Sequence, residues 1–393
     1  MIKAIKIQNF LSFADVNTEI DIRELNIIIG RNGSGKSSFI EAIDLLRSAP
    51  SASRFADNIR KHDAEEWLYK GYSKLVPAKI TYTLENMYEQ SKEDMPELKY
   101  TLSFTSENSQ FKLVEEKLSG ARKGEKAEKA ETVIFYDSNN GNPLIRDGES
   151  LVEAVGDSRY KNQSLFSMHR DHLHYPVIAS LADELEKIKI YRNWLLGPSS
   201  PLHQPQRGDV PGDQLSENLT NLPLVINRLD YLGLKKTILE DLSMFYKEIE
   251  DYSVNIDRGM AKLYFVEEDM KRSVSLISDG LLQFLCLLSI LRNPNPPPVI
   301  CIEEPETGLH PGILPTIGDI MKEFSLTKKC KLIVTTHATD LVDTFTDSPE
   351  DVLVAEKDYE GTWIKRLKKE ELALDENTLG ELWGMNLIGG NLW

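Results

Sequence analysis

The chain has 393 residues, of which 41% are hydrophobic, so it is long enough to bury a sizeable core. It has no run of about 18 apolar residues and passes from its first residues straight into a strand pattern, so we expect neither a membrane-spanning helix nor a signal peptide. The net charge of −16 argues against a surface coated with non-specific DNA contacts, although a local basic groove stays open as an alternative. The cysteines stand in apolar segments without metal-ligand spacing, which predicts buried thiols in a cytoplasmic protein: Cys286, Cys301 and Cys330.

The first part of the chain contains a glycine-rich motif between a strand and a helix. Strands are predicted at Ile2–Phe10, Thr18–Ile22 and Leu25–Ile29, and together they suggest a small sheet. The last of these runs into GRNGSGKSS, which fits the G-x-x-x-x-G-K-[ST] pattern of a phosphate-binding loop. A helix is predicted from Lys36 to Leu46, so the motif has the strand–loop–helix context that it requires.

This loop predicts a nucleoside triphosphate and Mg²⁺ as ligands. Glycines allow successive backbone N–H groups to curl around an anion, and the N-terminus of the helix adds its dipole. We expect Lys36 to reach the β- and γ-phosphates and Ser37 to hold Mg²⁺. The residues predicted to contact the nucleotide are Gly30, Asn32, Gly33, Ser34, Gly35, Lys36, Ser37 and Ser38.

The middle of the chain predicts strands first and helices later. Short alternating runs from Ala78 to about Arg146 favour an antiparallel β region. Within it the charged segment Glu115–Glu131 is predicted as a solvated hairpin tip, with a basic contact finger as the alternative. Helical patterns follow at Ala179–Lys187, Leu215–Leu232 and Leu234–Glu248.

The segment Val274–Ile290 places S-D-G directly before a strongly apolar helix. Ser278 is a good N-cap for that helix, and Gly280 leaves backbone N–H groups open to an anion. The three residues that we predict as an anion-binding corner are Ser278, Asp279 and Gly280. An ordinary helix cap is the alternative interpretation of the same residues.

Two buried strands further on end in titratable side chains. Val299–Glu304 ends in the carboxylates of Glu303 and Glu304, and Leu332–His337 ends in an imidazole. Adjacent strand residues point to opposite faces, so the two acids cannot share one role. The alternatives are a pair of solvated carboxylates and a structural histidine.

The order of these motifs resembles that of the ABC-type ATPases, in the branch that holds RecF and the SMC proteins. ISDGL at Ile277–Leu281 is similar to the LSGGQ signature, the Glu–Glu pair to Walker B, Pro305–Pro311 to the D-loop, and His337 to the switch histidine. The opening MIKAIKIQNFLSFAD is similar to the first strand of that branch. The closing LGELWGMNLIGG is similar to the end of bacterial ATPases related to the ATPase half of overcoming-lysogenization-defect nucleases.

The resemblance implies an α/β fold, namely an ABC-type head with a mixed sheet around the P-loop helix, an antiparallel β subdomain and a helical insertion. We expect one head over residues 1–393, with an N-terminal lobe at 1–160, an insertion at 161–250 and a C-terminal lobe at 251–393. No sustained heptad pattern separates the P-loop from the S-D-G segment, so no long coiled coil is expected.

The resemblance also implies how the site is assembled. Two ATP molecules are buried between two heads, the P-loop and Walker B of one copy facing the signature of the other, in a homodimer or higher oligomer. Glu304 takes the place of the general base, Glu303 that of the acid at Mg²⁺, and His337 contacts the γ-phosphate or the attacking water. Since Glu303 stands where most of the family has Asp, either acid is open as the metal contact. Gln163 is the candidate for the metal-binding glutamine of the Q-loop.

Three functions remain for such a head. The first is an ATPase that switches with nucleotide, in bacterial antiphage defence, beside a separately encoded nuclease or other effector. The second is a DNA-repair factor of RecF type that binds nucleic acid. The third is a scaffold that binds ATP without hydrolysing it.

Overall fold

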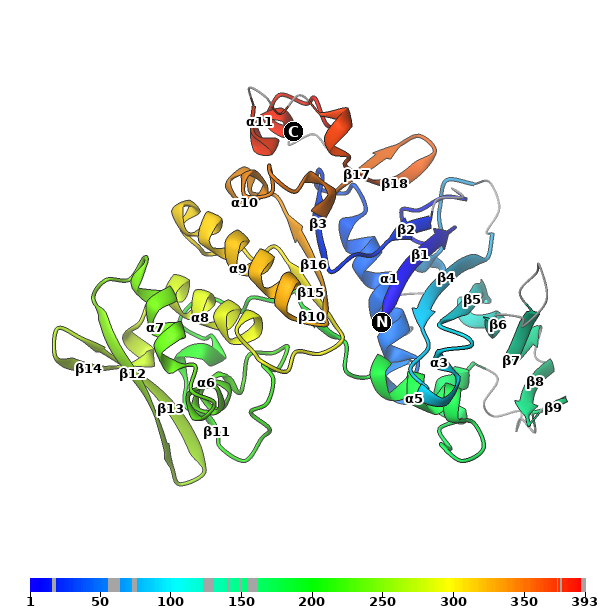
Figure 1. Ribbon diagram of the computed structural model, residues 1–393, viewed down its shortest axis with the longest axis horizontal. Coiled ribbons are helices and arrows are strands. Elements are labelled where there is room, and N and C mark those ends of the chain that lie inside the picture. Colours follow the sequence, from blue (N-terminus) through cyan, green and yellow to red (C-terminus); the bar gives the residue numbers. More distant parts are fainter. Residues whose placement is uncertain are drawn as a thin grey trace. The chain divides into compact units, whose positions relative to one another are not determined.

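The computed structural model describes residues 1–15, 19–55, 64–72, 76–122, 131–139, 142–148, 150–154, 162–372, 374 and 377–389. The chain divides into two compact units (Figure 1). The first unit comprises Met1–Ile188, Glu350–Leu372 and Asn386–Trp393, and the second comprises Lys189–Pro349 and Ala373–Met385. The glycine-rich loop therefore belongs to the first unit and the S-D-G, Glu–Glu and histidine motifs to the second. The predicted boundaries at 160 and 250 stay predictions.

The first unit contains an eight-stranded sheet, in the order β2-β1-β4-β5-β6-β7-β8-β9, whose neighbouring strands are antiparallel. The strands are β1 (Ile2–Gln8), β2 (Glu19–Asp21), β4 (Ala78–Glu85), β5 (Glu97–Glu107), β6 (Gln110–Arg122), β7 (Glu131–Asn139), β8 (Asn142–Asp147) and β9 (Ser150–Glu153). The predicted antiparallel region is confirmed. The predicted tip at Glu115–Glu131 is wrong in its first half, because residues up to Arg122 continue β6 and pair with β7. Residues 123–130 of the predicted tip lie outside the described residues.

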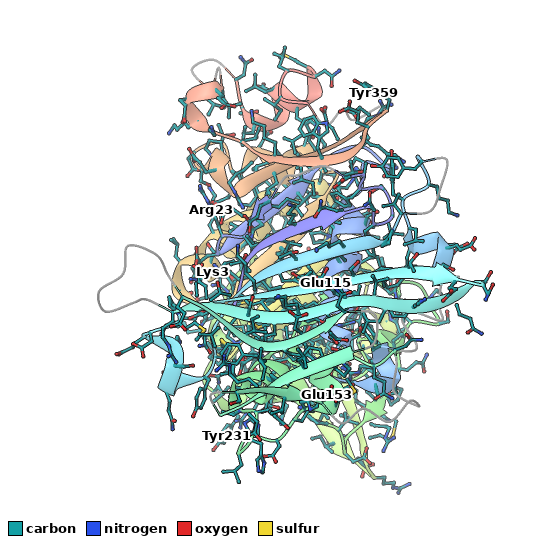
Figure 2. The ribbon with its side chains drawn as sticks, turned by 90° about the vertical axis from the view of Figure 1, so that its right-hand side faces the viewer. Lys3, Arg23, Glu115, Glu153, Tyr231 and Tyr359 are labelled. Atoms are coloured by element: carbon teal, nitrogen blue, oxygen red, sulfur yellow. The ribbon has the colours of Figure 1, made fainter. Side chains whose placement is uncertain are left out.

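The two faces of this sheet differ in chemistry. On the buried face, Tyr82 donates a hydrogen bond of 2.6 Å to the carbonyl of Ala42 in the helix α1 (Lys36–Ser48). On the other face, cross-strand ion pairs join Lys79 to Glu115 at 2.8 Å and Lys117 to Asp137 at 2.6 Å. Figure 2 shows Glu115 on the broad face of these strands. Such pairing of opposite charges stabilises neighbouring strands and keeps the exposed face solvated.

The strand that precedes the glycine-rich loop belongs to a different set of strands. β3 (Leu25–Ile29) pairs in parallel with β17 (Val352–Asp358), which pairs antiparallel with β18 (Gly361–Arg366). The predicted small sheet is therefore confirmed for β1 and β2, which pair with each other, and wrong for β3. The reason lies in the pattern: every residue of β3 is buried, as in a parallel strand covered on both faces, whereas β1 alternates.

Short helices complete the first unit. They are the 3₁₀ helix η1 (Ala64–Trp67) and the α-helices α3 (Glu89–Lys92), α4 (Leu165–Met168) and α5 (Pro176–Leu185). Ser164 caps α4 by accepting a hydrogen bond from the N–H of Phe166. α5 confirms the predicted helix at Ala179–Lys187. It begins earlier, at Pro176, because a proline suits the first turn of a helix.

A buried carboxylate connects the sheet to α4. Glu116 of β6 accepts hydrogen bonds of 2.7 Å from the hydroxyls of Tyr100 and Ser164, and the N–H of Leu165 donates to its Oε2 at 2.9 Å. Burial raises the pKa of Glu116 from 4.5 to about 7, although these hydrogen bonds favour the charged form.

The second unit has a parallel core and a separate antiparallel sheet. β10 (Lys189–Tyr191), β15 (Val299–Glu303) and β16 (Lys331–Thr336) are parallel neighbours, and Figure 1 shows α9 (Leu314–Thr327) alongside them. The antiparallel sheet contains β11 (Gln206–Arg207), β12 (Ile249–Asp257), β13 (Met260–Glu267) and β14 (Met270–Ser273). The remaining α-helices are α6 (Leu222–Tyr231), α7 (Lys235–Ser243), α8 (Asp279–Leu291), α10 (Thr339–Asp343) and α11 (Leu379–Gly384).

Two helices of this unit are shorter than predicted. α7 ends at Ser243 rather than at Glu248. α6 begins at Leu222 rather than Leu215, because Pro223 suits a first turn and the side chain of Asn221 accepts a hydrogen bond from the N–H of Ser216 in the preceding loop.

The three cysteines are buried, as predicted. Within the described part of the chain, every helix is too short or too polar to cross a bilayer.

The buried Glu116 makes the stability of the fold depend on pH. Its folded pKa is raised, so the stabilising contribution is full below about pH 4.5 and is lost as the pH rises through about 7. Glu116→Gln keeps an acceptor but does not titrate. We expect the variant to gain up to about 3 kcal/mol relative to the native chain between pH 5 and pH 8, measured by urea unfolding. Parallel stability curves for the two proteins would contradict this account.

Candidate nucleotide site

The loop between β3 and α1 owes its shape to glycine. Gly30, Gly33 and Gly35 have φ angles of 151°, 78° and 105°, a region that residues with a side chain rarely adopt. A Cβ added at Gly30 would lie 2.3 Å from the carbonyl oxygen of Ala355, and one at Gly35 would lie 2.5 Å from the Thr362 side chain. At Gly33 the corresponding space is open.

Two distant segments hold this loop in place. Thr362 of β18 donates from Oγ1 to the carbonyl of Ser34 at 2.9 Å, and its N–H donates to the carbonyl of Ser12 at 2.8 Å. Ser12 in turn donates from Oγ to Ser38 at 3.0 Å. The loop conformation is therefore fixed before any ligand binds, which lowers the cost of ordering it around an anion.

The predicted nucleotide contacts lie together here. Lys36 is buried, and its Nζ donates to the carbonyls of Gly30 at 2.6 Å and Arg31 at 2.9 Å. Asn32 and Ser37 are exposed at the loop and at the first turn of α1. The Oγ of Ser34 is buried without a hydrogen-bond partner among the described residues. A cradle of backbone N–H groups beside a lysine and free hydroxyls fits the phosphates of ATP.

A cavity of about 470 Å³ borders the same loop. Its wall combines charged side chains with one aromatic ring: Arg31, Asn32, Gly33, Ser34, Ala355, Glu356, Lys357, Asp358 and Trp363. Sequence reasoning missed the contribution of β17 and β18, since Thr362 and Ser34 stand 328 positions apart.

In the second unit the S-D-G corner begins α8. Ser278 is the N-cap, as predicted, and its Oγ accepts from the N–H of Leu281 at 3.4 Å. The carboxylate of Asp279 accepts from Nε2 of His203 at 2.7 Å and from the N–H of Gly197 at 3.0 Å. The His203 hydrogen bond is the main cause of the lowered pKa of Asp279.

The two acids after β15 occupy different surroundings. Glu303 ends the strand and its Oε1 lies 3.2 Å from Nε of Arg192. Glu304 lies beyond the strand with φ at 48°, and its N–H donates to the carbonyl of Thr335 at 2.9 Å. The prediction that strand alternation separates the two acids is therefore wrong. The left-handed turn at Glu304 gives the two acids different partners.

Glu304 and His337 form an acid–imidazole pair. Their Oε1 and Nε2 atoms are 3.5 Å apart. Glu306 holds the histidine in place, since its Oε1 accepts from the N–H of His337 at 2.7 Å and from the hydroxyl of Thr336 at 2.9 Å. Burial is the main cause of the raised pKa of Glu306, and the neighbouring Glu304 raises it further. Sequence reasoning missed Glu306, whose only signal is a third acid in EEPE.

The other predicted metal ligands are placed less directly. Gln163 is half-buried directly before Ser164 in the first unit, and its role as a metal ligand stays a prediction. Among the described residues no group of three or more His, Cys, Asp or Glu side chains is preassembled around a common point. Mg²⁺ commonly takes one or two protein ligands beside substrate phosphates and water, so that ion does not require a preassembled cluster, and the roles of Ser37 and Glu303 at it stay predictions.

Solved structures show which class of fold this is. The crystal structure of an SMC head bound to the C-terminal winged-helix domain of ScpA has a TM-score of 0.58 at 12% identity, covering 94% of this chain and 98% of that one. An SMC head with an extended coiled coil from Pyrococcus furiosus, bound to the C-terminal domain of ScpA, has a TM-score of 0.52 at 13% identity, with coverages of 94% and 96%. The predicted fold is confirmed: the chain has the α/β fold of the SMC heads.

The family follows from the sequence match. Residues 25–343 match the family described as "AAA domain, putative AbiEii toxin, Type IV TA system", and the chain belongs to that family. It is 22% identical over 372 residues to the ATP/GTP phosphatase of Helicobacter pylori (strain ATCC 700392 / 26695), covering 91% of this chain and 90% of that protein. A stretch of 105 residues is 31% identical to the chromosome partition protein Smc of Rhodopirellula baltica, covering 26% of this chain and 8% of that protein.

Two glycine substitutions separate backbone strain from steric clash in the loop. Gly33→Ala adds a methyl group to open space, so its cost is the strain of a positive φ, about 1 kcal/mol. Gly35→Ala adds the same strain and a clash with Thr362, so we expect it to destabilise more and to weaken ATP binding more. Urea unfolding and calorimetric ATP titration of both variants measure this. Equal effects on both quantities would contradict the bracing role of Thr362.

Proposed function

We propose that the chain hydrolyses ATP as a homodimer, each nucleotide lying between the P-loop and Walker B of one copy and the S-D-G corner of the other. The observation that carries the proposal is the pair Glu304–His337, in which a carboxylate and an imidazole 3.5 Å apart follow adjacent parallel strands. A backbone held at φ 48° in Glu304 costs about 1 kcal/mol or more, and such strain clusters at functional sites.

The residues then take distinct roles in hydrolysis. Glu304 accepts a proton from the attacking water, and His337 orients that water or the γ-phosphate. Lys36 binds the β- and γ-phosphates, and Ser278 with the N–H groups of Asp279 and Gly280 closes the anion cage from the partner copy. Mg²⁺, when bound with ATP, neutralises phosphate charge, and we assign Ser37, Glu303 and Gln163 to it.

The surroundings of the S-D-G corner suit a face covered by a second copy. The closest atoms to a Cβ added at Gly280 are the carbonyl oxygen of Gly308 and the hydroxyl of Tyr246, both at 3.2 Å. Next to that tyrosine in the sequence, Met244 and Phe245 are 56% and 37% exposed, and Leu276 before the corner is 73% exposed. Exposed apolar side chains beside a binding motif favour a protein interface.

The cellular role that we propose is a nucleotide-controlled switch in antiphage defence, in the cytoplasm, together with a separately encoded nuclease or other effector. The family's description as a type IV toxin–antitoxin component supports a role that involves a second polypeptide. Binding of nucleic acid by the RecF-type alternative is less favoured, because lysines on the exposed sheet face are paired with carboxylates.

Replacing the proposed base separates hydrolysis from binding. We expect Glu304→Gln to lower ATP turnover by about 100-fold or more and to keep ATP affinity. Glu268→Gln is the matched control, since this exposed glutamate also has a left-handed backbone, at φ 49°, but stands in the β13–β14 turn. Phosphate release and calorimetry measure both quantities. Native turnover no higher than that of Glu304→Gln would support the non-hydrolysing scaffold instead.

Blocking the corner tests its role between two copies. Ser278→Arg places a bulky cation at the proposed interface, so we expect the variant to bind ATP as a monomer while the native chain dimerises with ATP. Thr327→Arg, at the exposed C-terminal end of α9, is the control and should dimerise normally. Solution scattering with and without ATP measures the mass. Normal pairing of Ser278→Arg would show that S-D-G is a helix cap alone.

A further inference from the structure

One segment of the second unit contacts the Walker B strand. This segment, Arg192–His203, follows β10, and we call it the connector. Arg192 forms the ion pair with the carboxylate of Glu303, and Nε1 of Trp194 donates to the backbone carbonyl of the same residue at 2.8 Å. Both the side chain and the backbone of Glu303 are therefore held by the connector.

The same connector contacts the D-loop segment and the S-D-G corner. Leu196 packs on Gly308, where an added Cβ would lie 2.4 Å from its Cδ1. The N–H of Gly197 and Nε2 of His203 bind the two carboxylate oxygens of Asp279. Nδ1 of His203 lies 3.1 Å from the carbonyl of Val274. The ring therefore lies between Asp279 and the turn before it.

The connector is ordered by its own hydrogen bonds. The N–H of Ser200 donates to the carbonyl of Gly197 at 2.9 Å, and Oγ of Ser200 accepts from the N–H of Leu202. Ser200 is buried, and the 3₁₀ helix η3 (Pro201–His203) begins with a proline. A short segment fixed at both ends and in the middle transmits a displacement instead of absorbing it.

We propose that the connector couples the two nucleotide sites of the dimer. The inference rests on the proposed function, in which Glu303 serves the nucleotide on its own P-loop while Asp279 of the same copy serves the partner's nucleotide. Glu303 would hold Mg²⁺ when ATP is bound, and its carboxylate would then be drawn away from Arg192. Release of Arg192 then shifts the connector, which Trp194 keeps attached to the strand, and with it Gly197 and His203, which set the position of Asp279. Binding of the first ATP thus prepares the corner that receives the second.

The coupling is measured as cooperativity of ATP binding in the Glu304→Gln background, where hydrolysis does not interfere. We expect a Hill coefficient above 1, with the second ATP bound about fivefold or more tightly than the first. Trp194→Phe removes the indole N–H bond to Glu303 and keeps an aromatic ring beside Tyr191, and His203→Leu removes both ring bonds. Each should lower the Hill coefficient to 1 and keep two ATP per dimer. The combined variant should do no more than either single one, because both break the same chain of contacts.

Two further variants separate coupling from general structural damage. Tyr191→Phe removes a buried hydrogen bond of 2.7 Å to the carbonyl of Leu215, beside the connector but away from the motifs, and should keep the parent's cooperativity. His203→Gln keeps a donor toward Asp279 and should restore part of it. A parent Hill coefficient of 1, or connector variants as cooperative as the parent, would overturn the inference. Failure of the native chain to bind ATP at all would instead contradict the proposed function.

Discussion

The positive φ angles of Gly30, Gly33 and Gly35 are the constraint on which the rest of the structure depends. They give the loop a conformation that residues with a side chain rarely adopt, and a Cβ added at Gly30 or Gly35 would clash with Ala355 or Thr362. Those two residues come from β17 and β18, near the other end of the chain. The loop therefore takes this conformation only when β3 has paired with β17. Its shape depends on a strand pairing between two ends of the chain.

A second constraint acts at the ends of β15 and β16. The turn at Glu304 leaves the strand at once, which brings its carboxylate to His337 and leaves Glu303 with Arg192. Glu306 fixes this arrangement by accepting the backbone N–H of His337, so a half-buried acid positions the histidine and leaves its ring free of this contact. Three acids within four positions thus acquire three different environments.

Local patterns predicted a large part of this arrangement. The strand at Leu25–Ile29, the glycine loop, the cap at Ser278 and the strand before Glu303 follow from hydrophobic runs, glycines and capping chemistry within about ten residues. The contacts that the sequence could not predict join residues that lie far apart in the chain. β1, β2 and β3 are close in sequence, so a sheet of these three strands is the natural expectation. The complete burial of β3 distinguishes it from β1, because such burial is typical of a parallel strand. Thr362, Arg192 and His203 carry no motif, so their contacts with Ser34, Glu303 and Asp279 became visible only in the structure.

The central claim is that one copy supplies the P-loop and its partner supplies the S-D-G corner to the same nucleotide. Mixing two inactive variants, Lys36→Ala and Ser278→Arg, tests it most directly. A mixed dimer has one site with an intact P-loop from the second variant and an intact corner from the first. The account predicts that phosphate release, absent from either variant alone, returns on mixing. A mixture as inactive as its components, under conditions where the native chain turns over, would contradict it.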